Sequence, residues 1–169
     1  MVATRTDDGG FFVAVKKHFA FLESEAGLSL TSVRVIDEDP RDSGFVVTYR
    51  KGRDRVDVAW NPFELSLNVR VEAGTEGLSR GERFIPAEPF ITFITNGEVA
   101  PIVPQVYHKT SSAKIMRAMR LKERLFADGV GGPVEGLACR FRTYYPKIRD
   151  ATRETIRDFN RWYDQYTGD

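Results

Sequence analysis

Hydrophobic and polar residues alternate along four short runs between residues 31 and 72. In the last run the apolar positions are Leu65, Leu67, Val69 and Val71, and polar residues stand between them. Successive side chains of a β-strand point to opposite faces, so this alternation predicts strands with one apolar face. Because turn residues separate the runs, they predict an antiparallel meander. Its strands are expected near residues 31–37, 44–50, 55–60 and 65–72.

Outside the meander, apolar residues recur at spacings of three and four, which is typical of helices with one apolar side. The spacing predicts a first helix over 10–26, which Gly27 can end in the left-handed conformation. A second helix is expected over 111–127, beginning at two serines that can cap it. The stretch 133–169 keeps helical spacing to the end, and Pro146 should kink or split it because proline has no backbone donor.

Residues 73–110 show no periodicity, although they hold many apolar side chains between prolines and glycines. Long connections without secondary structure are uncommon in compact domains. We therefore expect a strand or a short helix around Phe90–Thr95. Together, these patterns predict one α+β domain over residues 1–169: an N-terminal helix, a four-stranded antiparallel meander, and two to three C-terminal helices packed on one sheet face.

The composition is that of an ordinary globular domain, with 41% hydrophobic and 29% charged residues. The N-terminus lacks the pattern of a signal peptide, and no apolar run is long enough to span a membrane. A single cysteine, Cys139, excludes an internal disulfide. These features predict a cytoplasmic protein without a membrane partner.

Charge is distributed unevenly, because residues 1–104 sum to −4 and residues 105–169 sum to +5. The acidic candidates are Asp37, Glu38, Asp39 and Asp42. They are interpreted either as a partner-docking loop or as a solvated turn, because they lack the ligand spacing of a calcium loop.

The basic candidates are Arg117, Arg120 and Arg124 on the predicted helix 111–127, where Glu123 is the only nearby acid. Like charges without compensation favour an external partner, and a solvated helix face is the alternative. A longer arginine series occurs at Arg149, Arg153, Arg157 and Arg161. Asp150, Glu154 and Asp158 precede Arg153, Arg157 and Arg161 at i, i+3 spacing, which favours a solvated face there.

Tyr107 and His108 complete the candidate binding residues. His18 and His108 are far apart, and neither has a second histidine or a cysteine at ligand spacing, so no metal site or cofactor is predicted. Cys139 is interpreted as a small buried hydrophobic residue, and a catalytic pairing with His108 is the less favoured alternative.

The order of apolar positions resembles that of small bacterial α+β proteins, some of which are immunity proteins that neutralise a paired toxin. The matching positions are Phe19, Phe21 and Leu22, then Val46–Tyr49 and Val56–Trp60, then Leu137, Ala138, Tyr144, Tyr145 and Pro146. This resemblance implies a non-enzymatic protein that sequesters a partner protein, and it transfers no functional residue. Two alternatives stay open: a small enzyme with a site near residues 84–110, and a nucleic-acid binder that uses the basic C-terminal helices.

Overall fold

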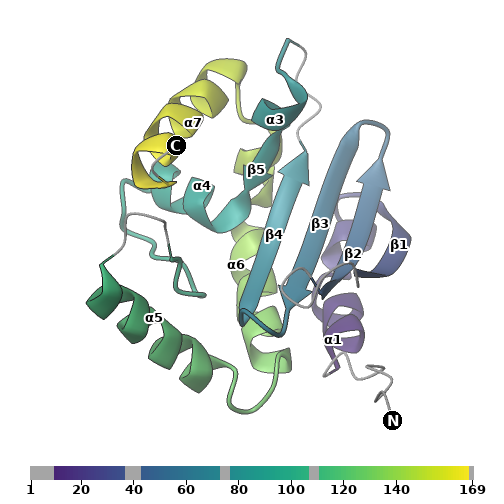
Figure 1. The fold of residues 1–169 in the computed structure, drawn as a ribbon. Coiled ribbons are helices and arrows are strands. Elements are labelled where there is room, and N and C mark those ends of the chain that lie inside the picture. Colours follow the sequence, from purple (N-terminus) through teal and green to yellow (C-terminus); the bar gives the residue numbers. More distant parts are fainter. Residues whose placement is uncertain (1–9, 37–42, 73–76, 107–110, 168–169) are drawn as a thin grey trace.

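A computed structural model describes residues 10–36, 43–72, 77–106 and 111–167 of the protein (Figure 1). Its strands are β1 (Ser29–Ile36), β2 (Gly44–Lys51), β3 (Asp54–Asn61), β4 (Ser66–Glu72) and β5 (Phe84–Pro86). Its helices are α1 (Phe11–His18), α2 (Phe21–Ser24), α3 (Arg80–Arg83), α4 (Ala87–Ile94), α5 (Ser112–Leu125), α6 (Gly131–Arg149) and α7 (Arg153–Thr167). The α+β class is thereby confirmed.

The strands form one antiparallel sheet in the order β1-β2-β3-β4-β5. The first four strands are the predicted meander, each within about two residues of its expected bounds. The fifth strand was not predicted, because its three residues are too few to show alternation. It pairs only with the last residues of β4, Arg70 to Glu72.

The two faces of the sheet differ as the alternation predicts. One row across the inner face consists of Val47, Val58 and Val69, which are all buried. A neighbouring row on the outer face consists of Thr48, Asp57 and Arg70. Helices α1 and α6 lie side by side behind the inner face (Figure 1). The sheet therefore has a covered apolar side and an outer polar side.

Helices α3, α4 and α7 pack at the β5 end of the sheet. Helix α4 contacts β4, α6 and α7, and α7 also contacts α3. Helix α4 is the short helix expected around Phe90–Thr95, and it begins a few residues earlier than predicted. Phe90 of α4 contacts Phe159 of α7 with their ring centroids 5.1 Å apart. The apolar side chains of the aperiodic segment thus complete the core, as their composition required.

The predicted helix 10–26 is interrupted, and this expectation was wrong in detail. Phe19 ends α1, and α2 begins at Phe21. In one continuous helix Phe19 and Phe21 would point to nearly opposite sides. The break lets both rings contact Phe141 of α6, at centroid distances of 6.0 and 6.3 Å. Gly27 does adopt the expected left-handed conformation, with φ 70°.

Three further expectations need correction. Leu65 is not in β4 but in the preceding turn, with a left-handed φ of 48°, and Asn61 Oδ1 accepts backbone N–H bonds in the same turn. Cys139 is exposed rather than buried, because it lies on the side of α6 that faces away from the core. Pro146 does not break α6 at its own position. Pro146 lies inside α6, which continues to Arg149, and the predicted helix 133–169 is split farther on, between Arg149 and Arg153.

Candidate functional site

The structure tests only part of the predicted binding surface. Asp37, Glu38, Asp39 and Asp42 lie outside the described residues, and so do Tyr107 and His108. Arg117, Arg120 and Arg124 lie on α5 as predicted, and all three are exposed. The described part of the candidate surface is therefore the basic side of α5.

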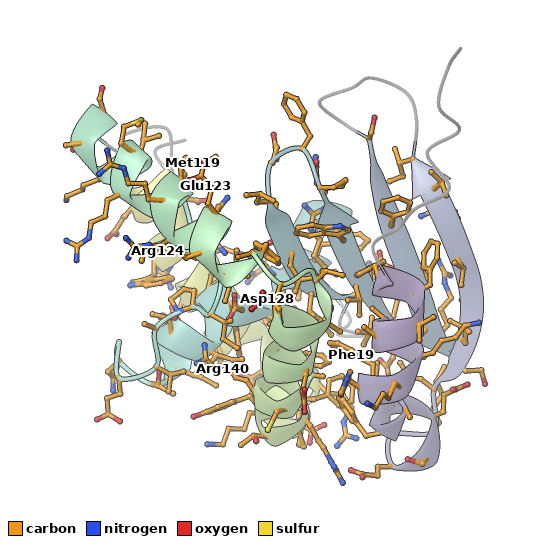
Figure 2. All side chains as sticks on the ribbon, turned by 90° about the horizontal axis from the view of Figure 1, so that it is seen from below. Phe19, Met119, Glu123, Arg124, Asp128 and Arg140 are labelled. Carbon is orange, nitrogen blue, oxygen red and sulfur yellow. The ribbon has the colours of Figure 1, made fainter. Side chains whose placement is uncertain are left out.

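Helix α5 lies at the margin of the molecule, away from α1 and from the centre of the sheet (Figures 1 and 2). None of its contacts with the other described helices and strands is extensive. Two contacts near its C-terminal end hold it. The ring of Phe126, which caps the helix, lies 4.6 Å from the ring of Trp60, measured between centroids. Lys122 Nζ donates a hydrogen bond to the backbone oxygen of Glu64, at 3.3 Å.

Lys122 illustrates how the sequence divides α5 into two sides. Its side chain is buried, and this burial lowers the pKa of its ammonium group, while Glu64 acts in the opposite direction. Ala118 and Phe126 are also buried on this inner side. The helical period then places the three candidate arginines on the outer side. Lys122 is the basic residue of α5 that anchors the helix rather than facing solvent.

The outer side of α5 combines positive charge with apolar surface. Within the described part of the chain, Arg117, Arg120 and Arg124 form no ion pair. Met116 and Leu121 flank them, with 57% and 44% of their surfaces exposed. We call these five residues the basic face of α5.

The arginines of α6 and α7 behave differently. Arg161 pairs with Asp158, Arg149 with Asp150, and Arg157 with Glu82 of α3. Of the three predicted i, i+3 pairs only Asp158–Arg161 forms among the described residues, whereas Asp150 pairs with Arg149 and Arg157 with Glu82. This contrast makes the basic face of α5 the less compensated of the two surfaces.

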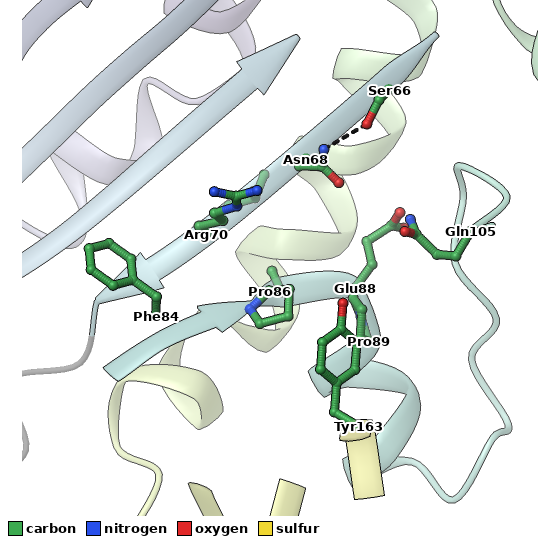
Figure 3. Close-up of a pocket in the computed structure, with 11 residues that line it drawn as sticks. Ser66, Asn68, Arg70, Phe84, Pro86, Glu88, Pro89, Gln105 and Tyr163 are labelled. Atoms are coloured by element: carbon green, nitrogen blue, oxygen red, sulfur yellow. Dashed lines mark hydrogen bonds between the residues drawn. The ribbon is translucent and has the colours of Figure 1, made fainter. Parts of the chain in front are cut away.

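A pocket of about 390 Å³ opens beside the first half of β4 (Figure 3). Its walls are formed by strand β4, strand β5, the start of α4, Gln105 and Tyr163 of α7. Burial raises the pKa of the Tyr163 hydroxyl, and Arg70 beside it acts in the opposite direction. Ser66 Oγ accepts a hydrogen bond from the Asn68 amide, at 2.8 Å. The lining is thus mainly polar and comes from four separate parts of the chain.

Glu88 contributes the carboxylate of this pocket, and its side chain is almost completely buried. Burial raises its pKa, while the amides of Ile102 and Val103 and the guanidinium of Arg140 act in the opposite direction. The Ile102 amide donates to Oε1 at 2.6 Å, and the Val103 amide donates to Oε2 at 3.3 Å. Both oxygens are therefore engaged, and Glu88 holds the segment after α4 in place.

Sequence reasoning missed Glu88, Arg140, Arg70 and Tyr163. A weak signal was present for Glu88, because it is the single acid within the apolar stretch 84–94. An isolated charge in such a stretch requires a buried partner. Its partner, Arg140, lies 52 residues later and could not be identified from local spacing.

Two further kinds of feature are absent from the described residues. No group of three His, Cys, Asp or Glu side chains is placed to hold a metal ion. None of the described helices is both long and apolar enough to cross a membrane. Among the described residues, no His or Cys lines the pocket beside β4.

Comparisons with known proteins do not extend this picture. No protein-family model matches the chain, and neither a curated protein nor a solved structure shows significant similarity to it. The geometry of the described residues is therefore the basis for a functional proposal.

Proposed function

We propose that this chain is a non-enzymatic binding protein that docks an acidic partner protein on the basic face of α5. The observation that carries this proposal is the exposed, uncompensated group Arg117, Arg120 and Arg124 on a helix that projects from the domain. Unpaired like charges repel one another, and an acidic partner would relieve this repulsion.

The apolar flank favours a protein partner over a nucleic acid. Arginine and methionine are enriched in protein interfaces, and the basic face contains three arginines beside Met116 and Leu121. Nucleic-acid-binding domains carry a strongly basic balance, whereas this chain has a net charge of +1. Binding to duplex DNA is therefore the alternative that the experiment must separate.

Sequestration of a paired partner, as in immunity proteins, is the form of binding that the apolar pattern of the sequence suggests. Such a role needs a preformed surface and no catalytic group. The buried contacts of Lys122 and Phe126 hold α5 in place before any partner arrives. Preorganisation of this kind lowers the entropic cost of association.

Affinity capture with a matched control tests the proposal. Wild-type protein, Arg117→Glu with Arg120→Glu, and Lys16→Glu with Lys17→Glu are each immobilised and exposed to the product of the adjacent reading frame. Lys16 and Lys17 are also exposed helical lysines, on the distant helix α1. We expect capture by the wild type and the α1 variant and loss of capture by the α5 variant.

Equal capture by all three proteins would rule out α5 as the docking surface. A parallel titration with duplex DNA at low salt addresses the alternative partner. Binding of DNA that is lost only in the α5 variant would assign the same face to nucleic acid instead.

A further inference from the structure

The pocket of about 390 Å³ beside β4 is enclosed by side chains from distant parts of the chain (Figure 3). Ser66, Asn68 and Arg70 are alternate residues of β4, so their side chains share the outer face of the sheet. Gln105 and Tyr163 enclose the pocket from the segment after α4 and from α7. The volume lies in the range of small-molecule sites.

Two charged side chains line this pocket among the described residues, and they differ in how they are bonded. The carboxylate of Glu88 is fully engaged, because Arg140 pairs with it at 3.2 Å and two backbone amides donate to its oxygens. Arg70, in contrast, is exposed and forms neither an ion pair nor a hydrogen bond within the described residues. The unmatched charge of the pocket is therefore positive.

The register of the sheet explains why Arg70 has no acidic partner. Asp57 stands directly opposite Arg70 on β3. Its carboxylate already binds Arg55, with distances of 2.8 Å from Nε and 2.7 Å from Nη2, and accepts a hydrogen bond from Thr48 at 2.7 Å. The Arg70 guanidinium thus keeps its N–H donors in the planar fork that matches the two oxygens of a carboxylate.

The uncharged polar groups of the pocket add unused acceptors. The Asn68 amide donates to Ser66 Oγ at 2.8 Å, and Gln105 Nε2 donates to the backbone oxygen of Val103 at 3.1 Å. Within the described residues, the side-chain oxygens of Asn68 and Gln105 accept no hydrogen bond. A hydroxyl group is a donor that such oxygens can bind. The pocket therefore suits a ligand with hydroxyl groups beside its negative charge.

One negative charge suits this pocket better than two. Arg70 compensates a single charge, and Arg140 is already paired with Glu88. A phosphate ester carries close to two negative charges at neutral pH, so part of its charge would stay uncompensated. A carboxylate carries one. The apolar part of the lining, which includes Phe84 and Pro86, offers contacts to the carbon atoms of a ring.

We infer that the pocket beside β4 binds a small hydroxylated monocarboxylate of the sugar-acid class. Its carboxylate binds the Arg70 guanidinium, and its hydroxyl groups donate to the side-chain oxygens of Asn68 and Gln105. This inference goes beyond the docking of a partner on α5, because it concerns a separate site and a small molecule.

D-Glucuronate and its neutral amide, D-glucuronamide, are matched probes, because the two molecules differ only in the charged group. Each is titrated into ¹⁵N-labelled protein at constant ionic strength. We expect glucuronate to shift the amide signals of Asn68, Arg70 and Gln105. Glucuronamide should bind at least about tenfold more weakly, which is the effect of losing a hydrogen bond between charged groups. Equal binding of the two probes would overturn the inference.

Two further anions test the rest of the assignment. Sodium acetate has the carboxylate without hydroxyl groups, and glucose 6-phosphate has the hydroxyl groups with a second charge. Both should bind more weakly than glucuronate. Acetate that binds as tightly would show that Arg70 attracts any anion and that the pocket selects no ligand. Tighter binding of glucose 6-phosphate would contradict the assignment of a single charge.

Three variants locate the site. Arg70→Gln should lower the affinity for glucuronate to that for glucuronamide, and a preference for the acid that persists in this variant would overturn the inference. Arg50→Gln changes an exposed arginine on the same outer face but outside the pocket, and should keep the preference. Gln105→Trp fills the pocket from a half-buried position and should weaken the binding of both probes.

The variant of α5 separates this site from the basic face. Arg117→Glu with Arg120→Glu should bind glucuronate as the wild type does. If glucuronate instead shifts the α5 amides and loses affinity in this variant, the inference is wrong. If glucuronate shifts no signal at its highest soluble concentration, the inference also fails, whereas the docking proposed for α5 is decided by its own capture experiment.

Discussion

Glu88 at the start of α4 and Arg140 in the middle of α6 form an ion pair, with Arg140 Nη1 3.2 Å from Glu88 Oε1; the Glu88 side chain is buried, and 26% of the Arg140 side chain is exposed. Arg140 also donates to the backbone oxygen of Ala100. One guanidinium thereby ties two helices and the segment after α4 together. The pair holds the Glu88 carboxylate at the wall of the pocket beside β4, where both of its oxygens already accept hydrogen bonds.

Replacing Arg140 by methionine should lower the free energy of unfolding, although methionine preserves most of the volume of the side chain. Removing Arg140 leaves the buried Glu88 carboxylate without its cation, and an uncompensated buried charge typically costs about 3 kcal/mol. Arg142→Met is the matched control, because Arg142 is on the same helix and pairs with Glu25 in an exposed position. An exposed pair contributes under about 1 kcal/mol. Urea denaturation measures the free energy of unfolding of both variants. Equal decreases in the two would show that the Arg140 ion pair contributes no more than the exposed Arg142 pair.

The pH dependence of stability should reveal the raised pKa of Glu88. Burial raises its pKa in the folded protein, so the folded state binds the Glu88 proton more tightly than the unfolded state does. The stabilisation from this proton is complete below the unfolded pKa, and it is lost as the pH rises through the folded pKa. The free energy of unfolding of the wild type, relative to Glu88→Gln, should therefore fall from about pH 4 toward neutrality. A difference that rises over this range would show that Arg140 and the two amides outweigh burial.

Phe126 should control the attachment of α5. Its ring lies against Trp60, so Phe126→Ala removes this ring contact and should cost about 3 kcal/mol. In a Trp162→Phe background, Trp60 is the remaining tryptophan, and its emission should shift to longer wavelength as water reaches it. Met116→Ala, on the exposed side of α5, serves as the control and should change neither property.

The sheet could be predicted because its information is local. Alternation in Leu67, Val69 and Val71 sets their strand and its buried face within a few neighbouring residues. The amphipathic spacing of α5 is equally local, and it placed Arg117 and Arg124 on the exposed side.

The pocket could not be predicted, because it depends on contacts between distant segments. Arg70, Glu88 and Tyr163 come from β4, α4 and α7, and no sequence spacing brings them together. The three-residue strand β5 is formed by pairing with β4 rather than by its own propensity. The break between α1 and α2 likewise depends on Phe141, more than 100 residues away. In each case tertiary contacts decide what local pattern leaves open.

Charge reversal on α5 should slow association with the partner while leaving the fold intact. Arg117, Arg120 and Arg124 are exposed and unpaired within the described residues, so Arg117→Glu with Arg120→Glu should change the free energy of unfolding by under about 1 kcal/mol. Steering by complementary charges raises association rates by about tenfold or more at low salt, and salt screens this effect. Stopped-flow measurements with the captured partner should therefore show a large rate difference at low salt that shrinks as salt is added. Asp37→Lys with Asp39→Lys provides the independent test of the acidic segment. Unchanged rates for both variants at low salt would mean that these charges only interact with solvent.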